Sequence, residues 1–296
     1  MLLCERNRCV IEIKILGLGA IGIFLSDILR RNGHEVYSLD LRTKSKNNSF
    51  ELILNGTVNT LFIKSSSELG SSEDLVIVAT KSFSIDSVMI QRLIDSNKEI
   101  IFLQNGISLY HSLNHESGNF SFGTIAGIQA FFSYNQVVAE TKNCNVMIKT
   151  GSNGRLVSTL LHPSNDDCSI NIYADFNELM LKKFIRWLIA SVITCLGGQP
   201  LGRTLLIFPF PEIMKGIDEI LEFINLEFGT HILNHEIYDS LVALPGNLMT
   251  SSFRDYALQG ENEMSFELKY VLSSLEDFSL GSATLRKWAA GLSIGQ

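Results

Sequence analysis

The chain has 296 residues, of which 46% are hydrophobic and 19% charged, and its formal net charge is −7. This length allows two domains of ordinary size, and the hydrophobic content supports packed cores and argues against disorder. The negative charge argues against nucleic acid as a partner, because phosphates demand clustered lysine and arginine. No apolar run reaches the roughly 18 residues of a membrane span, so we expect no membrane partner.

The five cysteines are odd in number and form no C-x-x-C pair, so they predict neither a zinc site nor a disulfide framework. Free thiols in a reducing compartment are the simplest interpretation. Charged residues interrupt the first ten positions, which therefore lack the apolar core of a secretory signal. We expect a cytoplasmic protein without a metal site.

The first forty residues predict one supersecondary unit. Residues 11–16 are typical of a strand, 17–22 of a tight turn, 21–31 of a helix and 35–39 of a second strand. Apolar residues at helical spacing support the helix, and Asn32-Gly33 would end it. Such a βαβ unit implies parallel strands, so we predict an α/β fold with a Rossmann-type doubly wound sheet.

The rest of the chain divides into a part with strand-type hydrophobic patterns and a part with helical spacing. Residues 75–79 and 100–103 are continuous apolar runs that predict buried strands, with a helix at 84–94 between them. From 124 to 172, short strands with turn signals predict an antiparallel extension. Helical spacing then takes over, in segments at 177–197, 213–228, 238–248 and 262–275. We therefore predict a dinucleotide-binding domain at 11–172 and a mainly helical substrate domain at 176–296.

The turn Gly17-Leu18-Gly19-Ala20-Ile21-Gly22 has the G-x-G-x-x-G spacing, and here a strand precedes it and a helix follows. Gly17 would permit the tight turn, Gly19 would let the backbone approach a pyrophosphate, and Gly22 would let helix and strand pack closely. The helix N-terminus would attract the negative charge. The alternative is a purely structural turn, but the context favours a dinucleotide.

Two residues after the second strand bear on which dinucleotide binds. Asp40 stands where an acidic side chain accepts hydrogen bonds from the adenosine ribose, which favours NAD. Arg42 follows, and a cation there could hold the 2′-phosphate of NADP. Arg42 and the following Lys44 and Lys46 could also be solvated loop charges, so the residues alone leave the choice open.

In these elements the chain resembles the ketopantoate reductase (2-dehydropantoate 2-reductase) family, over residues 13 to about 268. The resemblance rests on the glycine turn, on Gly33-His-Glu-Val36, on Leu75-Val-Ile-Val-Ala-Thr-Lys81, on Leu103-Gln-Asn-Gly106 and on Gly123-Thr124. It implies an oxidoreductase that uses NADPH to reduce a 2-keto acid to a 2-hydroxy acid, in pantothenate biosynthesis. The substrate would be a small keto acid, and a homodimer is an assembly that the resemblance allows.

The resemblance also implies roles for individual residues. Lys81 would lie beside the cofactor, and Asn105 would contact both the nicotinamide ribose and the substrate. Lys183 would support the carbonyl during hydride transfer, as a cation that stabilises the developing alkoxide and donates a proton. Lys182 is its neighbouring rival, and both could instead be surface cations. Glu263 would orient the catalytic groups, and Ser251 would hold the substrate carboxylate.

The resemblance fails at two substrate positions. Four and eight residues after Lys183, where the family has asparagines, this chain has Trp187 and Ser191. Tryptophan accepts no hydrogen bond and fills far more volume, so the substrate contacts must differ. We expect a keto acid other than ketopantoate. The alternative is a dinucleotide-binding regulatory or sensor protein that has lost catalysis.

Overall fold

The computed structural model describes residues 10–39, 48–66, 75–96, 98–113, 120–133, 136–149, 168–173, 176–258 and 262–294. These residues form two compact units. The first comprises the chain up to Gln104 and His115–Phe176, and the second comprises Asn105–Asn114 and Asn177–Gln296. Each unit has its own architecture, and Asn105–Asn114 groups with the helical unit although it lies within the predicted first domain.

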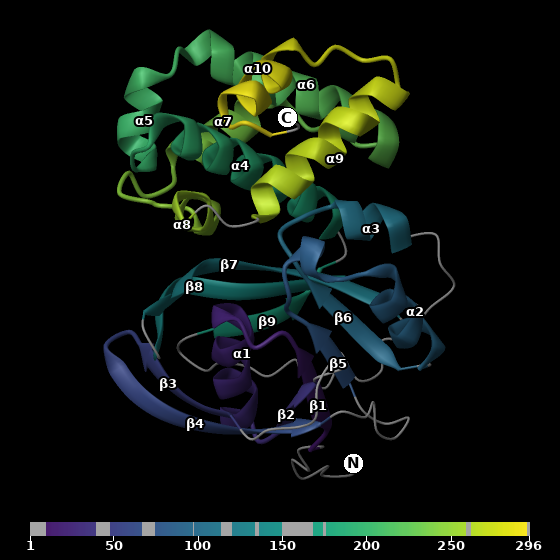
Figure 1. Cartoon of the computed structure of the whole chain (residues 1–296), viewed down its shortest axis with the longest axis vertical. Helices are drawn as coiled ribbons and strands as arrows, with labels where there is room; N and C mark the ends of the chain where they lie inside the picture. The colour runs from purple at the N-terminus through teal and green to yellow at the C-terminus, as the bar shows by residue number, and fades with distance from the viewer. Residues whose placement is uncertain are drawn as a thin grey trace, which may run out of the picture. The chain divides into compact units, whose positions relative to one another are not determined.

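The first unit is an α/β unit built on one nine-stranded sheet (Figure 1). Its strands are β1 (Glu12–Leu16), β2 (Glu35–Leu39), β3 (Asn48–Leu54), β4 (Thr57–Ser66), β5 (Leu75–Val78), β6 (Glu99–Leu103), β7 (Phe120–Ser133), β8 (Gln136–Lys149) and β9 (Cys168–Ile172). Its helices are α1 (Ala20–Arg31), the short 3-10 helix η1 (Ser82–Ser84) and α2 (Ser87–Asp95).

The centre of the sheet is parallel, as the βαβ unit predicts. The order is β3-β4-β2-β1-β5-β6-β7-β8-β9, with β1 parallel to both β2 and β5, and β6 parallel to β5 and β7. Strands β7 and β8 are antiparallel, as expected for this region, but each has 14 residues where short strands were expected. Strand β9 adds to β8 in parallel. The parallel strands β2, β1, β5 and β6 therefore end at a common edge of the sheet, and the glycine turn directly follows β1.

The prediction of a doubly wound sheet is wrong, because β3 also pairs with β8 and thereby closes the sheet into a barrel. Leu52 faces Val137 and Leu54 faces Ala139 across this parallel pairing, and all four are buried. The closure depends on the hairpin β3–β4, which the sequence analysis did not predict. Its turn, Asn55-Gly56, has positive φ angles of 50° and 83°, as tight hairpins of this kind require.

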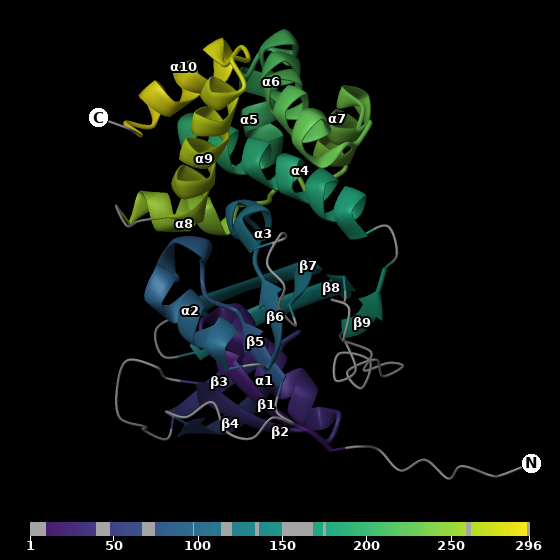
Figure 2. The same cartoon turned by 90° about the vertical axis from the view of Figure 1, so that its right-hand side faces the viewer.

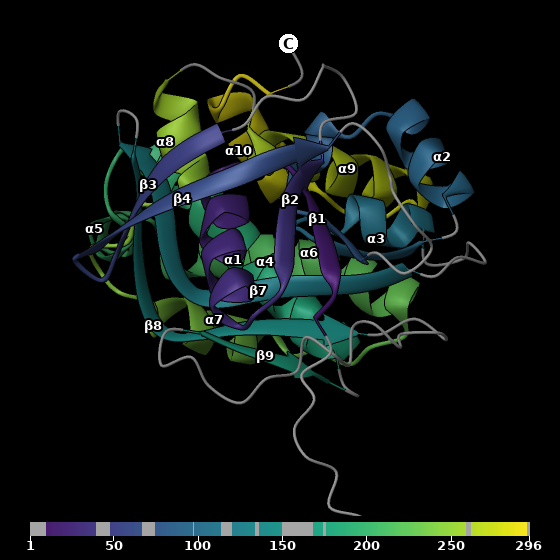
Figure 3. The same ribbon diagram turned by 90° about the horizontal axis from the view of Figure 1, so that it is seen from below.

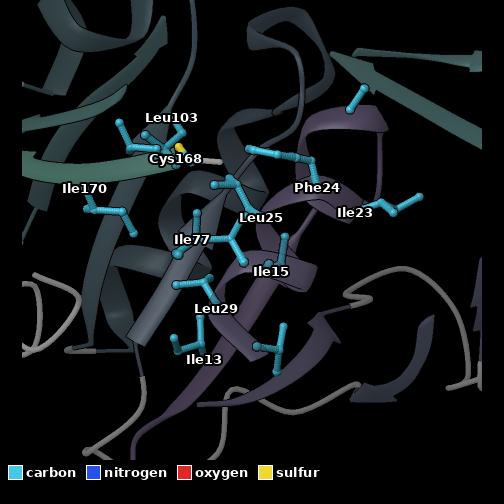
Figure 4. Packing of buried hydrophobic residues seen from close by; sticks show 14 of the residues in the cluster. Ile13, Ile15, Ile23, Phe24, Leu25, Leu29, Ile77, Leu103, Cys168 and Ile170 are labelled. Carbon is cyan, nitrogen blue, oxygen red and sulfur yellow. The ribbon is translucent and has the colours of Figure 1, made fainter. Parts of the chain in front are cut away.

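Helix α1 lies inside the closed sheet. Figure 3 shows the curved strands around it, with α2 outside. Every residue from Gly22 to Leu29 is buried. Phe24 and Leu25 of this helix pack with Ile15 and Ile77 of β1 and β5 in the core of the unit (Figure 4). A helix that buries its whole circumference fixes its N-terminus, and with it the glycine turn, firmly against the sheet.

The second unit is helical, as predicted for the C-terminal part of the chain. It comprises α3 (Ser108–Leu113), α4 (Phe176–Gly197), α5 (Leu201–Ile207), α6 (Phe210–Phe228), α7 (Asn234–Val242), α8 (Ser251–Ala257), α9 (Glu263–Asp277) and α10 (Ala283–Gly291). Helices α6, α9 and α10 pack against one another (Figure 2). Gly216 of α6 makes room for Trp288 of α10, whose ring atom would lie 2.2 Å from a Cβ there. Among the described helices, none has the length and hydrophobicity to cross a membrane.

Candidate functional site

The glycine turn occupies the carboxyl edge of the parallel strands in the first unit. Gly17 has a φ of 101°, and a Cβ there would come within 2.5 Å of the Thr80 side chain. A Cβ on Gly22 would come within 2.0 Å of the Gly17 carbonyl oxygen. Neither position therefore tolerates a side chain, and the two glycines hold the turn closely against the start of α1.

Gly19 differs from the other two glycines. It is the exposed N-cap residue of α1, and a Cβ there would meet no atom within 4 Å. Leu18, Ala20 and Ile21 beside it are half-buried. The first turn of α1 contains no acidic residue, so the N-terminal N–H groups present a positive end without an opposing charge in that turn. Exposed backbone at a helix N-terminus suits a phosphate group.

Residues following β5 and β6 complete this edge. The Ala79 N–H donates to the Leu16 carbonyl at 2.9 Å, and Gln104 Nε2 donates to the Thr80 carbonyl at 3.1 Å. The Thr80 hydroxyl is buried and has no hydrogen-bond partner among the described residues. Lys81 follows, exposed, with its Nζ 6.0 Å from the centre of the Phe83 ring. The open backbone at Gly19, in the same turn as the Gly17 that Thr80 contacts, fits a polar ligand such as a dinucleotide. Asp40 and Arg42 lie outside the described residues.

A second cluster lies within the helical unit and joins three of the predicted residues. Lys183 Nζ, from α4, donates to Asn105 Oδ1 at 2.8 Å. Asn105 Nδ2 donates to Glu263 Oε2, from the first turn of α9, at 3.3 Å. The ammonium can only donate and the carboxylate can only accept, so the two together fix the orientation of the Asn105 amide between them.

The pKa of Lys183 is lowered to about 7. Burial is the main cause, because it penalises the ammonium, and the nearby Arg186 guanidinium adds repulsion, while Glu263 opposes both effects. A lysine that titrates near neutral pH can both donate and accept a proton under physiological conditions. Arg186, itself half-buried, is a residue that the sequence analysis did not single out.

Lys182 has the opposite surroundings. Its Nζ lies 2.7 Å from Glu178 Oε1 and 3.1 Å from Glu236 Oε1. These carboxylates raise its pKa, with the Glu178 contact as the largest cause. Lys182 is therefore a paired structural cation, and the geometry favours Lys183 as the lysine of the candidate site.

The predicted substrate residues continue along α4 and into α8. Trp187 is half-buried, with its ring centre 6.2 Å from that of Phe184. Ser191 is fully buried, and its hydroxyl has no hydrogen-bond partner among the described residues. Ser251 is exposed in the first turn of α8, whereas the neighbouring Thr250 is buried, with its hydroxyl 3.4 Å from that of Thr194.

One important residue near this cluster was missed. Glu267, one helical turn after Glu263, is completely buried and accepts hydrogen bonds from Ser108 Oγ and from two backbone N–H groups. Its pKa is raised, mainly by burial. The spacing of four residues between the two glutamates was the available signal, because it places both on one face of a helix. The described residues contain no group of side chains that could hold a metal ion.

The fold and the two clusters thus define an α/β unit with a dinucleotide-type glycine turn, followed by a helical unit with a lysine–asparagine–glutamate centre. Comparison with known proteins narrows this class. Residues 13–149 match the family model of ketopantoate reductase PanE/ApbA. This match confirms the resemblance to ketopantoate reductases, a family of oxidoreductases, over these residues of the first unit.

Solved structures share the fold of the whole chain. A probable 2-dehydropantoate 2-reductase from Bacillus subtilis is 18% identical, with a TM-score of 0.76 over 96% of this chain and 99% of that one. A dimeric ketopantoate reductase from Staphylococcus aureus is 15% identical, with a TM-score of 0.75 over 96% and 98%. D-mandelate dehydrogenase, solved with NADH and anilino(oxo)acetate, is 15% identical, with a TM-score of 0.77 over 96% and 97%. No curated protein sequence matches the chain.

Proposed function

We propose that the protein is an NAD(P)H-dependent reductase that converts a 2-keto acid to a 2-hydroxy acid. The observation that carries this proposal is the hydrogen-bonded series Lys183–Asn105–Glu263, with a lysine whose pKa lies near neutrality. The match of residues 13–149 to the ketopantoate reductase family model supports the same reaction class.

The dinucleotide would be held by the glycine turn, with its pyrophosphate at Gly19 and the N-terminus of α1, and with Lys81 nearby. When bound, it supplies the hydride. The open backbone at Gly19 and the unsatisfied Thr80 hydroxyl fit such a ligand. We favour NADP as the cofactor, with NAD as the alternative because of Asp40. The neighbour D-mandelate dehydrogenase was solved with NADH, so both dinucleotides belong in the test.

Residues of the helical unit would donate the proton that the reduction requires and position its donor. Lys183 would place its ammonium against the carbonyl oxygen of the substrate, stabilise the negative charge that develops there, and transfer a proton from Nζ. Asn105 accepts a hydrogen bond from Nζ and so restricts its position. Glu263 fixes the Asn105 amide in the orientation that this bond requires. Trp187 and Ser191 would contribute to substrate selection, and Ser251 would contact the substrate carboxylate.

The proposal is tested by titrating the purified protein with NADPH and with NADH, and then assaying a panel of 2-keto acids that includes ketopantoate. We expect binding of a reduced dinucleotide and its oxidation in the presence of at least one keto acid. Tight dinucleotide binding without turnover on any keto acid would instead support a regulatory or sensor protein. Tighter binding of NADH than of NADPH would overturn the preference for NADP.

A further inference from the structure

The segment that carries Asn105 is attached to helix α9 by three successive polar contacts. Asn105 contacts Glu263, as described above, Ser108 contacts Glu267, and His111 Nδ1 lies 2.6 Å from the Tyr270 hydroxyl. The contacts recur every three residues on the segment and every three or four on the helix, so they follow one face of α9. We call this set of contacts the α3–α9 ladder.

The middle contact of the ladder is the most extensive. Glu267 Oε2 accepts from the backbone N–H groups of Ile107 at 3.1 Å and Ser108 at 3.2 Å, and Oε1 accepts from Ser108 Oγ at 2.7 Å. Gly106 permits this approach, because a Cβ there would lie 1.9 Å from Oε1. The carboxylate therefore holds the backbone directly after Asn105.

We propose that Glu267 is a positioning residue for the reductase reaction, which fixes the Asn105 backbone so that the Asn105 side chain can hold Lys183. This inference rests on the proposed function. Glu267 has three hydrogen-bond donors around its two oxygens, and those donors come from Ile107 and Ser108, so it acts through the backbone and not on the substrate. Burying a carboxylate completely is costly, and the three hydrogen bonds that Glu267 accepts from Ile107 and Ser108 offset that cost.

Two substitutions separate hydrogen bonding from charge and volume. In Glu267→Gln the amide oxygen can accept from both backbone N–H groups while the amide nitrogen donates to Ser108 Oγ, because a hydroxyl also accepts. In Glu267→Leu the volume is retained, but the two N–H groups and the hydroxyl lose their acceptor. Ser274→Ala is the control, since Ser274 is buried in the same helix and its hydroxyl bonds to Tyr270 of that helix rather than to the segment that carries Asn105.

Four measurements are made on each full-length variant: hydrogen exchange of residues 105–113, the affinity for the reduced dinucleotide, the kinetics with the best keto acid, and the pKa of Lys183 by NMR. We expect Glu267→Leu to exchange faster at Ile107 and Ser108 and to lose about 10- to 100-fold in kcat, as a displacement of about 1 Å can cause. Its affinity for the dinucleotide should fall much less than kcat, because the glycine turn would hold the pyrophosphate and Asn105 would contact only the nicotinamide ribose. Lys183 should titrate at lower pH, because its ammonium loses the Asn105 acceptor. Glu267→Gln should restore exchange, and kcat to within a few fold, and Ser274→Ala should resemble the wild type.

Faster exchange in Glu267→Leu with unchanged kcat and unchanged Lys183 pKa would overturn the positioning role, as would an equal loss of kcat in Ser274→Ala. Unchanged exchange would show that Glu267 does not anchor the segment. If the wild type reduces no keto acid, the proposed function fails. The exchange rates and the Lys183 pKa then still decide whether Glu267 controls the placement of Asn105.

Discussion

Two neighbouring lysines on α4 illustrate how much the surroundings of a residue matter. Lys182 lies between two carboxylates, which raise its pKa. Lys183 contacts the Asn105 amide instead, and burial together with the Arg186 guanidinium lowers its pKa to about 7. The same side chain is therefore a permanent cation at one position and a titrating acid at the next.

Replacing Lys183 by methionine should lower kcat/KM for keto-acid reduction by about 10²- to 10⁴-fold, the usual contribution of a general acid. The affinity for the dinucleotide should be unchanged, because the glycine turn belongs to the other unit. Lys182→Met is the matched control and should retain activity within a few fold. Equal losses in the two variants would contradict the assignment, and steady-state kinetics with a binding titration make the comparison.

The rate of reduction should depend on pH with the sign set by Lys183. Reduction needs the protonated lysine, so kcat/KM should be constant below a pH of about 7 and fall about tenfold per pH unit above it. Oxidation of the hydroxy acid needs the neutral amine, so kcat/KM for oxidation should rise with pH up to about 7 and then become constant. A flat profile for reduction between pH 6 and 9 would rule out Lys183 as the proton donor.

At the scale of elements, the turn between β1 and α1 contains one glycine that has no room for a side chain, Gly22, and one that has room, Gly19. Gly22→Ala forces a Cβ to within 2.0 Å of the Gly17 carbonyl and should destabilise the fold by about 1–3 kcal/mol. Gly19→Ala meets no neighbouring atom and should cost about 1 kcal/mol or less. It should nevertheless weaken dinucleotide binding by about tenfold or more, which corresponds to roughly 1.4 kcal/mol.

Denaturant unfolding and dinucleotide titration of both glycine variants check this prediction. Normal dinucleotide affinity in Gly19→Ala would mean that the pyrophosphate does not approach this backbone. The glycine turn would then have a structural role only.

The elements could be predicted where their evidence is local. The strands before and after α1, and the helices α4, α6 and α9, follow from apolar spacing and turn residues. The β3–β4 hairpin was missed although Asn55-Gly56 is a strong turn signal. Glu267 was missed for another reason: a glutamate in a helix is usually exposed. Its spacing from Glu263 places both on one face of α9, but its burial depends on a segment 159 residues away in the sequence.

The roles of Asn105, Lys183 and Glu263 came from family resemblance. Composition and spacing alone do not bring positions 105, 183 and 263 together, since this depends on tertiary packing. The structure places the three within hydrogen-bonding distance of one another in series. Trp187 and Ser191 stand where the family has asparagines that contact the substrate. The chemistry of these two residues does not define the group that the keto acid carries beside its carbonyl.

At the scale of the first unit, the closure of the sheet depends on few residues. Asn55 donates through Nδ2 to Thr141 Oγ1 at 2.8 Å and accepts from the Thr141 N–H at 2.9 Å, where β3 meets β8. Asn55→Gly keeps the freedom for a positive φ but removes both bonds, and should lower the free energy of unfolding by about 1 kcal/mol.

The exposed Thr57→Ala, on the same hairpin, is the control for Asn55→Gly and should have a smaller effect. Denaturant unfolding with hydrogen exchange along β8 measures both. Unchanged exchange of the Thr141 amide in Asn55→Gly would show that closure does not depend on this contact.

The pairing of β3 with β8 also has a consequence for how the chain folds. Glu51 and Gln136, which are partners in this pairing, are 85 residues apart, so the sheet can close only after a long loop has been ordered. During synthesis β3 emerges long before its partner, and until then one side of the core around α1 has no cover. Closure should therefore be a late step in refolding, and the intermediate before it is the species most exposed to aggregation.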